Sequence, residues 1–558
     1  MRRYRRLGGF LVVVALAAAG CSAMADDQGA PGLARQYSSP ARITHPPKGT
    51  SLAHGQLSGL VRAPGGPYLK DALGRTVFLH GVNAVYKYPP FYLTEAPGKP
   101  WNFSAADAAN IARLGFTVVR LGILWQGLEP GSGGPNNPAV CTPGHGTSSS
   151  MYNAGTAQRY LRAVQRTVDL LGRYGIYTLL DMHQDVYTQA FRGEGMPAWS
   201  VCSGTAPIVA LPGRWSHNYR NMALDVAVQH FWENDVVGNL QGQFDQSWGT
   251  VARFFSHNPW ILGYDPYNEP FAREVTLDET LSFAVQLECF YNGTQDPGLL
   301  AGDTTVSCPK DDPRRGVIPT IQKADPHHLI FVEPDIYSIH NNPSLLGPMD
   351  FPNLVLNFHS YCSTRSPVTG QPTNVDACSD QTLHTMLRRQ SERPTMASRF
   401  QRGGPAWFMS EFGANQNQDL LGQVADYADA LQVGWTEWAW KYYNDPTGST
   451  AEAMVSPSGV LQPAALALSR PYAQAVAGSP ISSSVAHDGT FQLDYTPSDR
   501  VAGPSIIFVP GRLHYPHGYC ASVSGGLIRS APGAAHLVVS NDRDATEVSV
   551  TVTPGRCH

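Results

Sequence analysis

Eight short apolar runs with strong β propensity recur between about residues 77 and 441, and stretches long enough for a helix separate them. Strands that alternate with helices are typical of a parallel sheet with right-handed crossovers. Eight such units over about 370 residues fit a (β/α)₈ barrel with long insertions. The runs begin at Thr76, Phe116, Tyr177, Ile261, His328, Leu354, Ala406 and Gly434. The sequence therefore predicts an α/β fold built on a TIM barrel.

Helical patterns occupy several of the gaps between these runs. Residues 104–114 begin with Ser104 as a candidate N-cap and carry Asp107 at the capping-box position. Residues 156–174 have a second helical pattern. Both stretches lie where the barrel requires a crossover, so they support the alternation of strand and helix.

The predicted strands end in polar or aromatic residues. In a barrel of this kind the carboxyl ends of the strands surround the active site, so all eight ends point into one bowl. Taken singly, Asn83 and Glu333 are rim residues, but eight such ends in register indicate a functional site. The residues at these ends are Asn83, Arg120, His183, Asn268 with Glu269, Glu333, His359 with Tyr361, Glu411 and Trp438.

The pattern changes near residue 471 to short alternating strands without helices. Four such strands begin near residues 490, 505, 535 and 547. This pattern predicts a small antiparallel β-sandwich. We therefore divide the chain into an export signal (1–21), a flexible linker (22–52), a catalytic barrel domain (53–468) and a C-terminal β-sandwich domain (469–558).

The first residues have the pattern of an export signal. Four arginines within residues 2–6 precede an apolar run from Phe10 to Ala19, which is too short to span a membrane. Residues 18–21 (AAGC) resemble the lipobox at which a bacterial lipoprotein is cut and acylated, although the usual leucine is absent. We expect a protein that is secreted, or anchored to the outer face of the cell membrane through Cys21.

Eight cysteines remain after Cys21, an even number in a chain that we expect to be exported. Disulfides persist in oxidising compartments, so four bridges are the economical interpretation. Neighbours in sequence suggest the pairs Cys141–Cys202, Cys289–Cys308, Cys362–Cys378 and Cys520–Cys557, although spacing does not decide the connectivity.

Charge and motif content argue against two other classes of function. Lysine plus arginine number 40 and aspartate plus glutamate 44, so the net charge of −4 offers no basic field for phosphates. The chain has no CxxC pair and no HExxH helix, the usual signatures of zinc sites. We expect no nucleic-acid partner, no metal and no other cofactor.

Two carboxylates follow opposite strands of the predicted barrel. Glu269 lies in the sequence Asn-Glu-Pro after the fourth run, and Glu411 lies in Ser-Glu-Phe-Gly at the end of the seventh. Glycoside hydrolysis needs such a pair, in which one carboxyl protonates the leaving oxygen and, in a retaining enzyme, the other attacks the anomeric carbon about 5 to 5.5 Å away. Burial or the charge of Glu411 would keep Glu269 protonated, and Arg120 would keep Glu411 ionised.

This set of strand-end residues resembles glycoside hydrolase family 5. Within that family, four segments closely resemble the endoglycoceramidases of actinobacteria: residues 181–187 (DMHQDVY), 196–199 (MPAW), 264–271 (YDPYNEPF) and 410–413 (SEFG). The resemblance extends over about residues 70 to 555.

The resemblance implies a role for each matching residue. Glu269 matches the acid/base and Glu411 the nucleophile, while Asn268 would bind the hydroxyl at carbon 2 of the attacked sugar. Trp438 would form the flat floor beneath the sugar. Asp185 would either contact the sugar or orient His183, and both alternatives stay open. The residues that we expect to bind substrate are Lys87, Arg120, His183, Asp185, Asn268, His359, Tyr361 and Trp438.

The leading hypothesis is hydrolysis, with retention, of the β-linkage between the glycan and the ceramide of a glycosphingolipid. The eighth run (435–443) is bulkier and more charged than the serine-rich run expected of an endoglycoceramidase, and the sixth lacks the usual proline before His359. The alternatives are other glycolipids, aryl or steryl glycosides, a galactosylceramide series, or a non-catalytic carbohydrate-binding surface protein.

The expected partners follow from this hypothesis. They are a glycolipid or another β-glycoside as substrate and a membrane surface, and we expect the chain to be a monomer. The aromatic segment 86–92, together with Trp199 and Trp215, fits either an apolar slot for a ceramide tail or packed loops.

Overall fold

The computed structural model describes residues 61–62, 68–146, 151–272, 277–293, 308, 316–336, 346, 349, 351–361 and 406–557. The predicted export signal, the linker and the Cys362–Cys378 pair lie outside these residues. Among the described residues, no helix combines the length and the apolarity that a membrane span requires.

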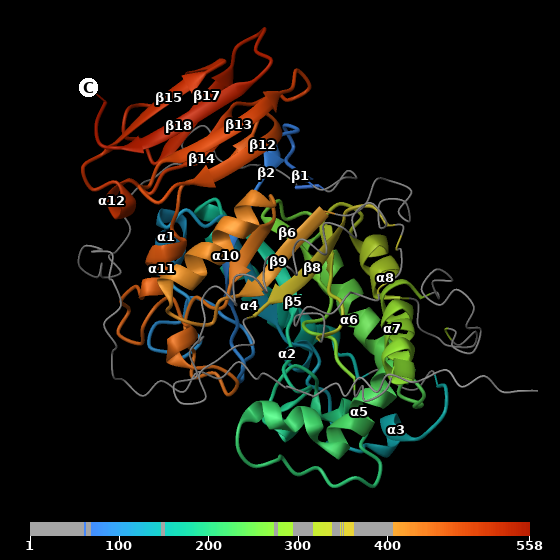
Figure 1. Ribbon diagram of the computed structural model, residues 1–558. Helices are drawn as coiled ribbons and strands as arrows, with labels where there is room; N and C mark the ends of the chain where they lie inside the picture. The colour runs from blue at the N-terminus through green and yellow to red at the C-terminus, as the bar shows by residue number, and fades with distance from the viewer. Residues whose placement is uncertain are drawn as a thin grey trace, which may run out of the picture.

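Eight parallel strands close into a barrel, as the sequence predicts (Figure 1). Each strand is hydrogen-bonded to its two neighbours in parallel register, and β10 closes the ring against β3. The strands are β3 (His80–Ala84), β4 (Val118–Ile123), β5 (Tyr177–Met182), β6 (Ile261–Asp265), β7 (Leu329–Val332), β8 (Leu354–Ser360), β9 (Ala406–Phe412) and β10 (Gly434–Glu437).

Helices surround this barrel. The capping box predicted at Ser104 and Asp107 is present at the start of α1 (Ala105–Arg113), where each side chain accepts a hydrogen bond from the other residue's backbone N–H. The second predicted helix is α4 (Ala154–Arg173). The other helices are α2 (Trp125–Leu128), α3 (Pro138–Cys141), α5 (Met222–Glu233), α6 (Leu240–Phe255), α7 (Leu277–Asn292), α8 (Val317–Ala324), α10 (Gln418–Ala430) and α11 (Pro463–Leu468).

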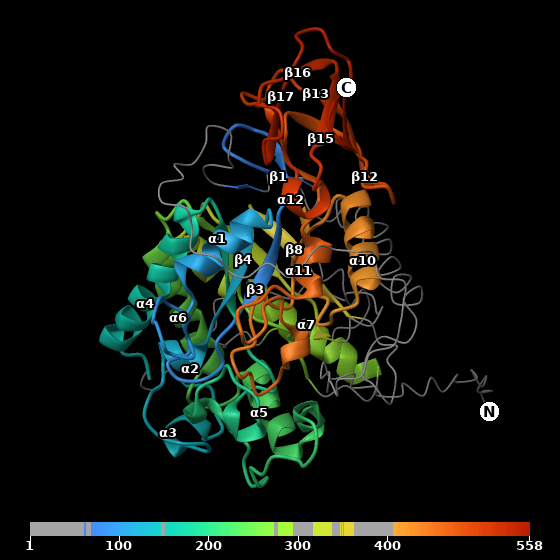
Figure 2. The ribbon, with the colours of Figure 1, turned by 90° about the vertical axis from the view of Figure 1, so that its left-hand side faces the viewer.

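The C-terminal part of the chain forms two antiparallel sheets (Figure 2). Residues 76–83, which the sequence predicts to be one barrel strand, divide between the two domains: β2 pairs with β11, while β3 enters the barrel. The predicted barrel domain thus contributes β1 and β2 to the C-terminal sheet. One sheet contains β1 (Leu69–Lys70), β2 (Thr76–Val77), β11 (Tyr472–Val476), β14 (Ser505–Phe508), β17 (His536–Asn541) and β16 (Gly526–Ile528); the other contains β12 (Gly478–Val485), β13 (Phe491–Pro497), β18 (Val548–Pro554) and β15 (Tyr519–Ser524).

One apolar cluster joins this sheet to the amino-terminal end of the barrel. Val77, Ala475 and Ile506 of the sheet pack in it with residues near the starts of the barrel strands, such as Val118 and Ala406. The C-terminal domain therefore covers the end of the barrel opposite the carboxyl ends of its strands (Figure 1).

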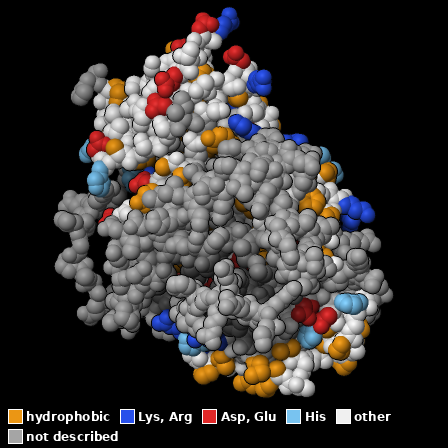
Figure 3. Space-filling view, turned by 45° about the vertical axis from the view of Figure 1, so that its right-hand side comes forward, with side chains coloured by type: hydrophobic (Ala, Val, Ile, Leu, Met, Phe, Trp, Pro, Cys, Tyr) orange, Lys and Arg blue, Asp and Glu red, His pale blue; other side chains and the backbone are white. Residues whose placement is uncertain are grey.

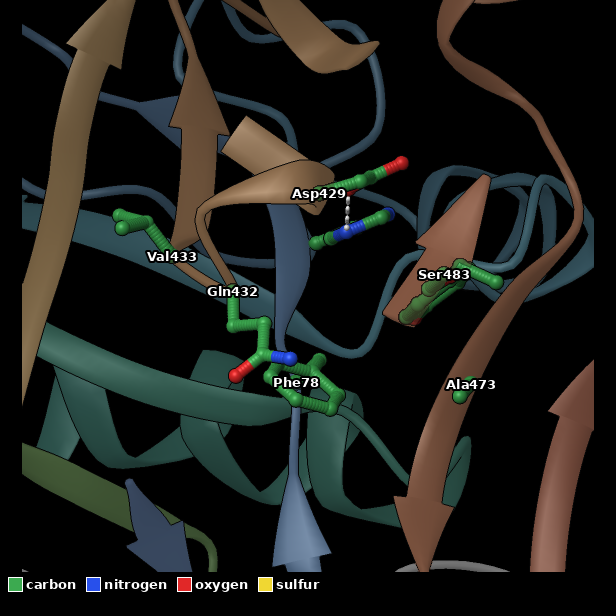
Figure 4. Close-up of a pocket in the computed structure, with 8 residues that line it drawn as sticks. Phe78, Asp429, Gln432, Val433, Ala473 and Ser483 are labelled. Carbon is green, nitrogen blue, oxygen red and sulfur yellow. Dashed lines mark ion pairs between the residues drawn. The ribbon is translucent and has the colours of Figure 1, made fainter. Parts of the chain in front are cut away.

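Polar side chains line the edge of the same junction. A small pocket lies between the domains, with Phe78, Gln432 and Ser483 in its lining (Figure 4). Beside it the His80 ring stacks between Trp435 and Tyr472, at centroid distances of 4.2 and 3.7 Å. The Nε2 atom of His80 lies 3.0 Å from Asp429 Oδ1. These contacts hold β3 and the end of α10 to the C-terminal sheet.

Three of the four predicted disulfides are present. They are Cys141–Cys202, Cys289–Cys308 and Cys520–Cys557. The first links the insertion after β4 to the insertion after β5, and the third joins β15 to the segment after β18. Each bridge thus restrains a segment outside the eight barrel strands.

Substitution of Gly115 should separate packing at the domain junction from backbone strain. Gly115 has φ +87°, and an added Cβ would lie 2.2 Å from the Phe508 ring, whereas Gly98 has φ +75° and no atom within 4 Å of that position. Both alanine variants carry the strain of a positive φ, but only Gly115→Ala also overpacks the junction, by ~1–3 kcal/mol. Gly115→Ala should therefore lower the urea midpoint of unfolding more than Gly98→Ala. Equal midpoints would contradict this packing.

Candidate active site

Glu269 and Glu411 converge at the carboxyl ends of the barrel strands. Glu411 lies within β9, and Glu269 follows β6 by four residues. A carboxylate oxygen of each, with a ring nitrogen of His359, lies within 4.8 Å of the other two atoms. This separation is near the value of about 5 to 5.5 Å typical of retaining glycosidases.

Both oxygens of Glu411 accept hydrogen bonds from buried donors. Arg120 Nη1 donates to Oε1 at 2.6 Å, and the Tyr361 hydroxyl donates to Oε2 at 2.8 Å. Only 5 % of the Glu411 side chain is exposed. The guanidinium and the hydroxyl together hold this carboxylate in a fixed orientation.

Glu269 is held through its backbone as well as its side chain. Its N–H donates to Glu333 Oε2 at 2.9 Å, and its Oε1 lies 2.8 Å from His359 Nδ1. Its φ of 45° lies in the left-handed region, which is unfavourable for a residue with a Cβ. Glu333 is therefore more than a rim residue, because it stabilises the backbone that presents Glu269.

The electrostatic environments of the carboxyls in the bowl differ. Burial raises the pKa of Glu269, and the negative charge of Glu411 raises it further, against the opposing influence of His359. Burial also acts on Glu333, but His359 and Arg120 outweigh it and lower the pKa of Glu333 to about 2. Glu269 is therefore the carboxyl best suited to hold a proton near neutral pH.

Arg120 lies beneath the site rather than in contact with open space. It is fully buried, and its guanidinium also donates to Asn268 Oδ1 at 2.8 Å and to Glu333 Oε1 at 2.9 Å. Asp181 and Asp265 complete its ion pairs, at 3.1 and 2.9 Å. The structure shows that Arg120 orients Glu411 and Asn268; its expected role in binding substrate stays a prediction.

Lys87 is enclosed in a second charged cluster. Its Nζ lies 2.5 Å from Asp185, 3.1 Å from Glu194 and 3.2 Å from Asp445, and it donates to the Thr447 hydroxyl at 2.6 Å. Burial alone lowers the pKa of Lys87, but these carboxylates hold it well above its usual value. The ammonium therefore fixes Asp185, and the expected role of Lys87 in binding substrate stays a prediction.

A tight loop after β5 brings Asp185 and Glu194 together. The two residues pair in an antiparallel bridge, with their N–H groups and carbonyls bonded at 3.1 and 2.9 Å. Gly193 permits this approach, because a Cβ there would lie 1.7 Å from the Asp185 carbonyl oxygen. The short spacing of glycines in this loop was the signal in the sequence that could have revealed Glu194.

His183 and Trp438 form one side of the bowl. Their rings stack at a centroid distance of 5.2 Å, and Lys87 Nζ lies 4.7 Å from the Trp438 ring. His183 Nδ1 is 2.7 Å from Asp181, and its Nε2 is 3.6 Å from Asp185. Asp185 therefore contributes to orienting His183, the second of the two alternatives left open by the sequence.

Asn268 has its amide fixed from both sides. Its Oδ1 accepts from Arg120, and its Nδ2 donates to the Gln184 carbonyl at 3.0 Å. Trp199, by contrast, is fully buried, with its Nε1 donating to the Glu129 carbonyl at 3.1 Å. Trp199 therefore belongs to the packed loops and not to a slot for a lipid tail.

Among the residues that the structure describes, two groups of side chains have the composition of a metal site: Glu269 with His359 and Glu411, and His183 with Asp185 and Glu194. In the second group the Lys87 ammonium lies among the carboxylates. The first consists of the residues that we expect to perform the chemistry and to line the sugar site. In both groups the carboxylates therefore have charged or polar protein side chains as partners.

The comparisons with known proteins agree with this geometry. Residues 89–444 match the family model described as cellulase (glycosyl hydrolase family 5), and residues 470–553 match the C-terminal domain model of the same family. The chain belongs to glycoside hydrolase family 5. It is therefore a glycosidase with the barrel and the C-terminal sheet domain of that family.

Curated members of the family resemble the chain over most of its length. The endoglycoceramidase of Hydra vulgaris is 27 % identical over 480 residues, which cover 81 % of this chain and 80 % of that protein. Endoglycoceramidase I of Rhodococcus hoagii (strain 103S) is 27 % identical over 509 residues, covering 86 % and 85 % of the two chains.

Solved structures share the fold. Endo-glycoceramidase II from Rhodococcus sp., in a complex with ganglioside GM3, has a TM-score of 0.63 at 23 % identity, covering 88 % of this chain and 100 % of that one. An endogalactoceramidase has a TM-score of 0.61 at 21 % identity, covering 89 % and 100 %.

Two further acids lie behind Trp438. Glu437 is fully buried and Glu452 is 3 % exposed. The Glu452 carbonyl accepts a hydrogen bond from the N–H of Ala439 at 2.9 Å. Burial, followed by the charge of Asp445, raises the pKa of Glu452 to about 8, and burial raises that of Glu437. Glu452 is therefore protonated at weakly acidic pH.

Glu452→Gln should make the protein less sensitive to alkaline pH. A carboxyl whose pKa is higher in the folded state contributes stability below its unfolded value of 4.5, and this contribution is lost as the pH rises through about 8. The loss is at most ~1.4 kcal/mol per pH unit. The free energy of unfolding, measured with urea, should therefore decrease more between about pH 5 and pH 8 in the wild type than in Glu452→Gln. Glu547→Gln, at an exposed position, should behave as the wild type; equal pH dependence in all three proteins would contradict the assignment.

Proposed function

We propose that this family 5 enzyme is a retaining glycosidase in which Glu411 is the nucleophile and Glu269 the acid/base. The observation that carries the proposal is the pair of carboxyls within 4.8 Å in contrasting environments. Glu411 is bonded to a buried guanidinium, whereas burial and the charge of Glu411 raise the pKa of Glu269. Glu411 is therefore suited to act as the nucleophile, and Glu269 is suited to donate a proton.

The reaction has two steps. In the first, a Glu411 oxygen bonds to the anomeric carbon, the bond from that carbon to the aglycone oxygen breaks, and Glu269 gives its proton to this oxygen. In the second, Glu269 takes a proton from water, the water oxygen bonds to the anomeric carbon, and the bond to Glu411 breaks. Two inversions give net retention, and both carboxyls return to their starting states.

The surrounding residues assist each step. Asn268, with its amide fixed by Arg120 and Gln184, is oriented to bind the hydroxyl at carbon 2. The hydrogen bond of Tyr361 to Glu411 must weaken as the carboxylate becomes an ester. His359 lies between Glu269 and Glu333 and supports the return of the proton to Glu269. His183 and Trp438 provide the wall against which the sugar binds.

We further propose that the substrate is a glycosphingolipid and that the bond cleaved joins glycan to ceramide. Relatives named endoglycoceramidase cover most of the chain, which supports this choice. The apolar signal and Cys21 support export, with the protein either secreted or held at the outer face of the cell membrane. We expect the protein to be a monomer.

The substrate is tested with a panel of glycosides. The purified protein is incubated with lactosylceramide, a ganglioside, glucosylceramide, galactosylceramide, a steryl glucoside and an aryl lactoside, and the products are identified by mass spectrometry. Release of intact glycan and ceramide, with β-configured sugar as the first product by NMR, is the expected result. Cleavage of the steryl or aryl glycosides alone would reject the ceramide proposal but leave the catalytic assignment standing.

Alanine variants of the two carboxyls should respond differently to the leaving group. Glu411→Ala should lose several orders of magnitude in kcat/KM on every substrate, because no covalent intermediate can form. Glu269→Ala should lose far more on an alkyl glycoside than on a dinitrophenyl glycoside, because the activated phenolate departs without protonation. Equal losses on the two substrates in Glu269→Ala would contradict the acid/base role, and retained activity in Glu411→Ala would contradict the nucleophile.

A further inference from the structure

The insertion after β5 exposes apolar side chains at the same end of the molecule as the bowl. Among the described residues, the two most exposed large hydrophobic side chains are Val209, at 66 %, and Met222, at 69 %. Figure 1 places α5, which begins at Met222, at the end opposite the C-terminal domain, and Figure 3 shows hydrophobic side chains gathered at that end. We call residues 206–222 the docking segment.

A network of hydrogen bonds holds these side chains outward. Asn221 Nδ2 donates to the Val209 carbonyl at 2.9 Å, and its Oδ1 accepts from the Ala223 N–H at 3.0 Å as the cap of α5. Asn218 similarly joins Leu211 to Trp215. These hydrogen bonds therefore bring Val209 and Met222 close together, and both side chains stay exposed in the folded segment.

The docking segment is also fixed to the rest of the protein. The Arg192 guanidinium donates to the Gly213 carbonyl at 2.5 Å, and Cys202 is bonded to Cys141 just before the segment begins. The Tyr219 ring packs edge-on against Phe271, at a centroid distance of 4.8 Å, and Phe271 is two residues from Glu269. The inner side of the segment thus borders the catalytic bowl, while its outer side exposes Val209 and Met222.

The charged residues of the segment are all basic, which favours an anionic partner. Residues 195–224 contain no aspartate or glutamate, although the whole chain has a net charge of −4. Within them Arg214, His217 and Arg220 are exposed beside the apolar side chains, and Trp215 is half-buried. Exposed apolar side chains in a segment that also exposes arginines and contains a tryptophan are typical of segments that lie in the interface of an anionic bilayer.

We propose that the docking segment binds the surface of an anionic lipid bilayer and holds the mouth of the bowl against it. Val209 and Met222 would enter the boundary between headgroups and acyl chains, and Arg214 and Arg220 would face the lipid phosphates. The proposal rests on the proposed function for its purpose, because a glycolipid in a membrane presents its glycosidic bond close to this boundary. The binding itself requires no glycolipid and no turnover.

The experiment measures co-sedimentation of the protein, lacking residues 1–52, with vesicles that contain no glycolipid. Vesicles of phosphatidylcholine with phosphatidylglycerol should bind the wild type, and those of phosphatidylcholine alone should bind it weakly. The double variant Val209→Ser/Met222→Ser should bind the anionic vesicles at least tenfold more weakly, given roughly tenfold per apolar side chain withdrawn from water. Arg214→Glu should weaken binding at low salt and lose its effect at high salt.

A matched control is available in the C-terminal domain. Leu527 is 51 % exposed on β16, and Leu527→Ser should bind vesicles as the wild type does. All variants should hydrolyse a soluble aryl glycoside at the wild-type rate. Unchanged vesicle binding by the double variant, or an equal loss in Leu527→Ser, would overturn the proposal. Vesicle binding without cleavage of any glycosphingolipid would instead reject the proposed substrate and leave the docking surface intact.

Discussion

A buried guanidinium supports the chemistry of this protein. Arg120, within β4, is fully enclosed and faces Asp181, Asp265, Glu333 and Glu411. Without that cation, several carboxylates would share a low-dielectric site with severe mutual repulsion and an unpaid cost of desolvation. With it, the Glu411 side chain is oriented, Asn268 is fixed, and Glu333 accepts a hydrogen bond from the backbone N–H of Glu269. The barrel makes this possible by bringing the ends of distant strands around one point.

The same principle operates a second time nearby. Lys87 lies against the Trp438 ring and gathers Asp185, Glu194 and Asp445, and Glu437 and Glu452 are buried carboxyls with raised pKa values in the segments next to Trp438 and Ala439. The wall formed by His183 and Trp438 is thus bordered by buried electrostatic pairs. Such pairs fix the orientation of the side chains beside them, and they account for the charge of the eighth strand.

The two ends of the barrel serve different purposes. At the amino-terminal end, an apolar cluster and the stacked His80 ring attach the C-terminal sheets. At the carboxyl end, polar side chains converge and the insertion after β5 projects Val209 and Met222. Packing against one end leaves the other free for substrate and for the lipid surface that we propose, so the chain separates stability from recognition.

The sequence alone determined the eight-strand barrel, the sandwich that follows it and the pair Glu269 and Glu411, because strand periodicity and the polar ends of strands are local patterns with a known place in this fold. It also indicated three disulfides from neighbouring cysteines. Tertiary structure decided which residues touch. The division of residues 76–83 between two domains depends on pairing with β11, and the carboxylates that enclose Lys87 and Arg120 come from positions far away in the chain. No local pattern encodes contacts of this range, since they arise only when the barrel closes.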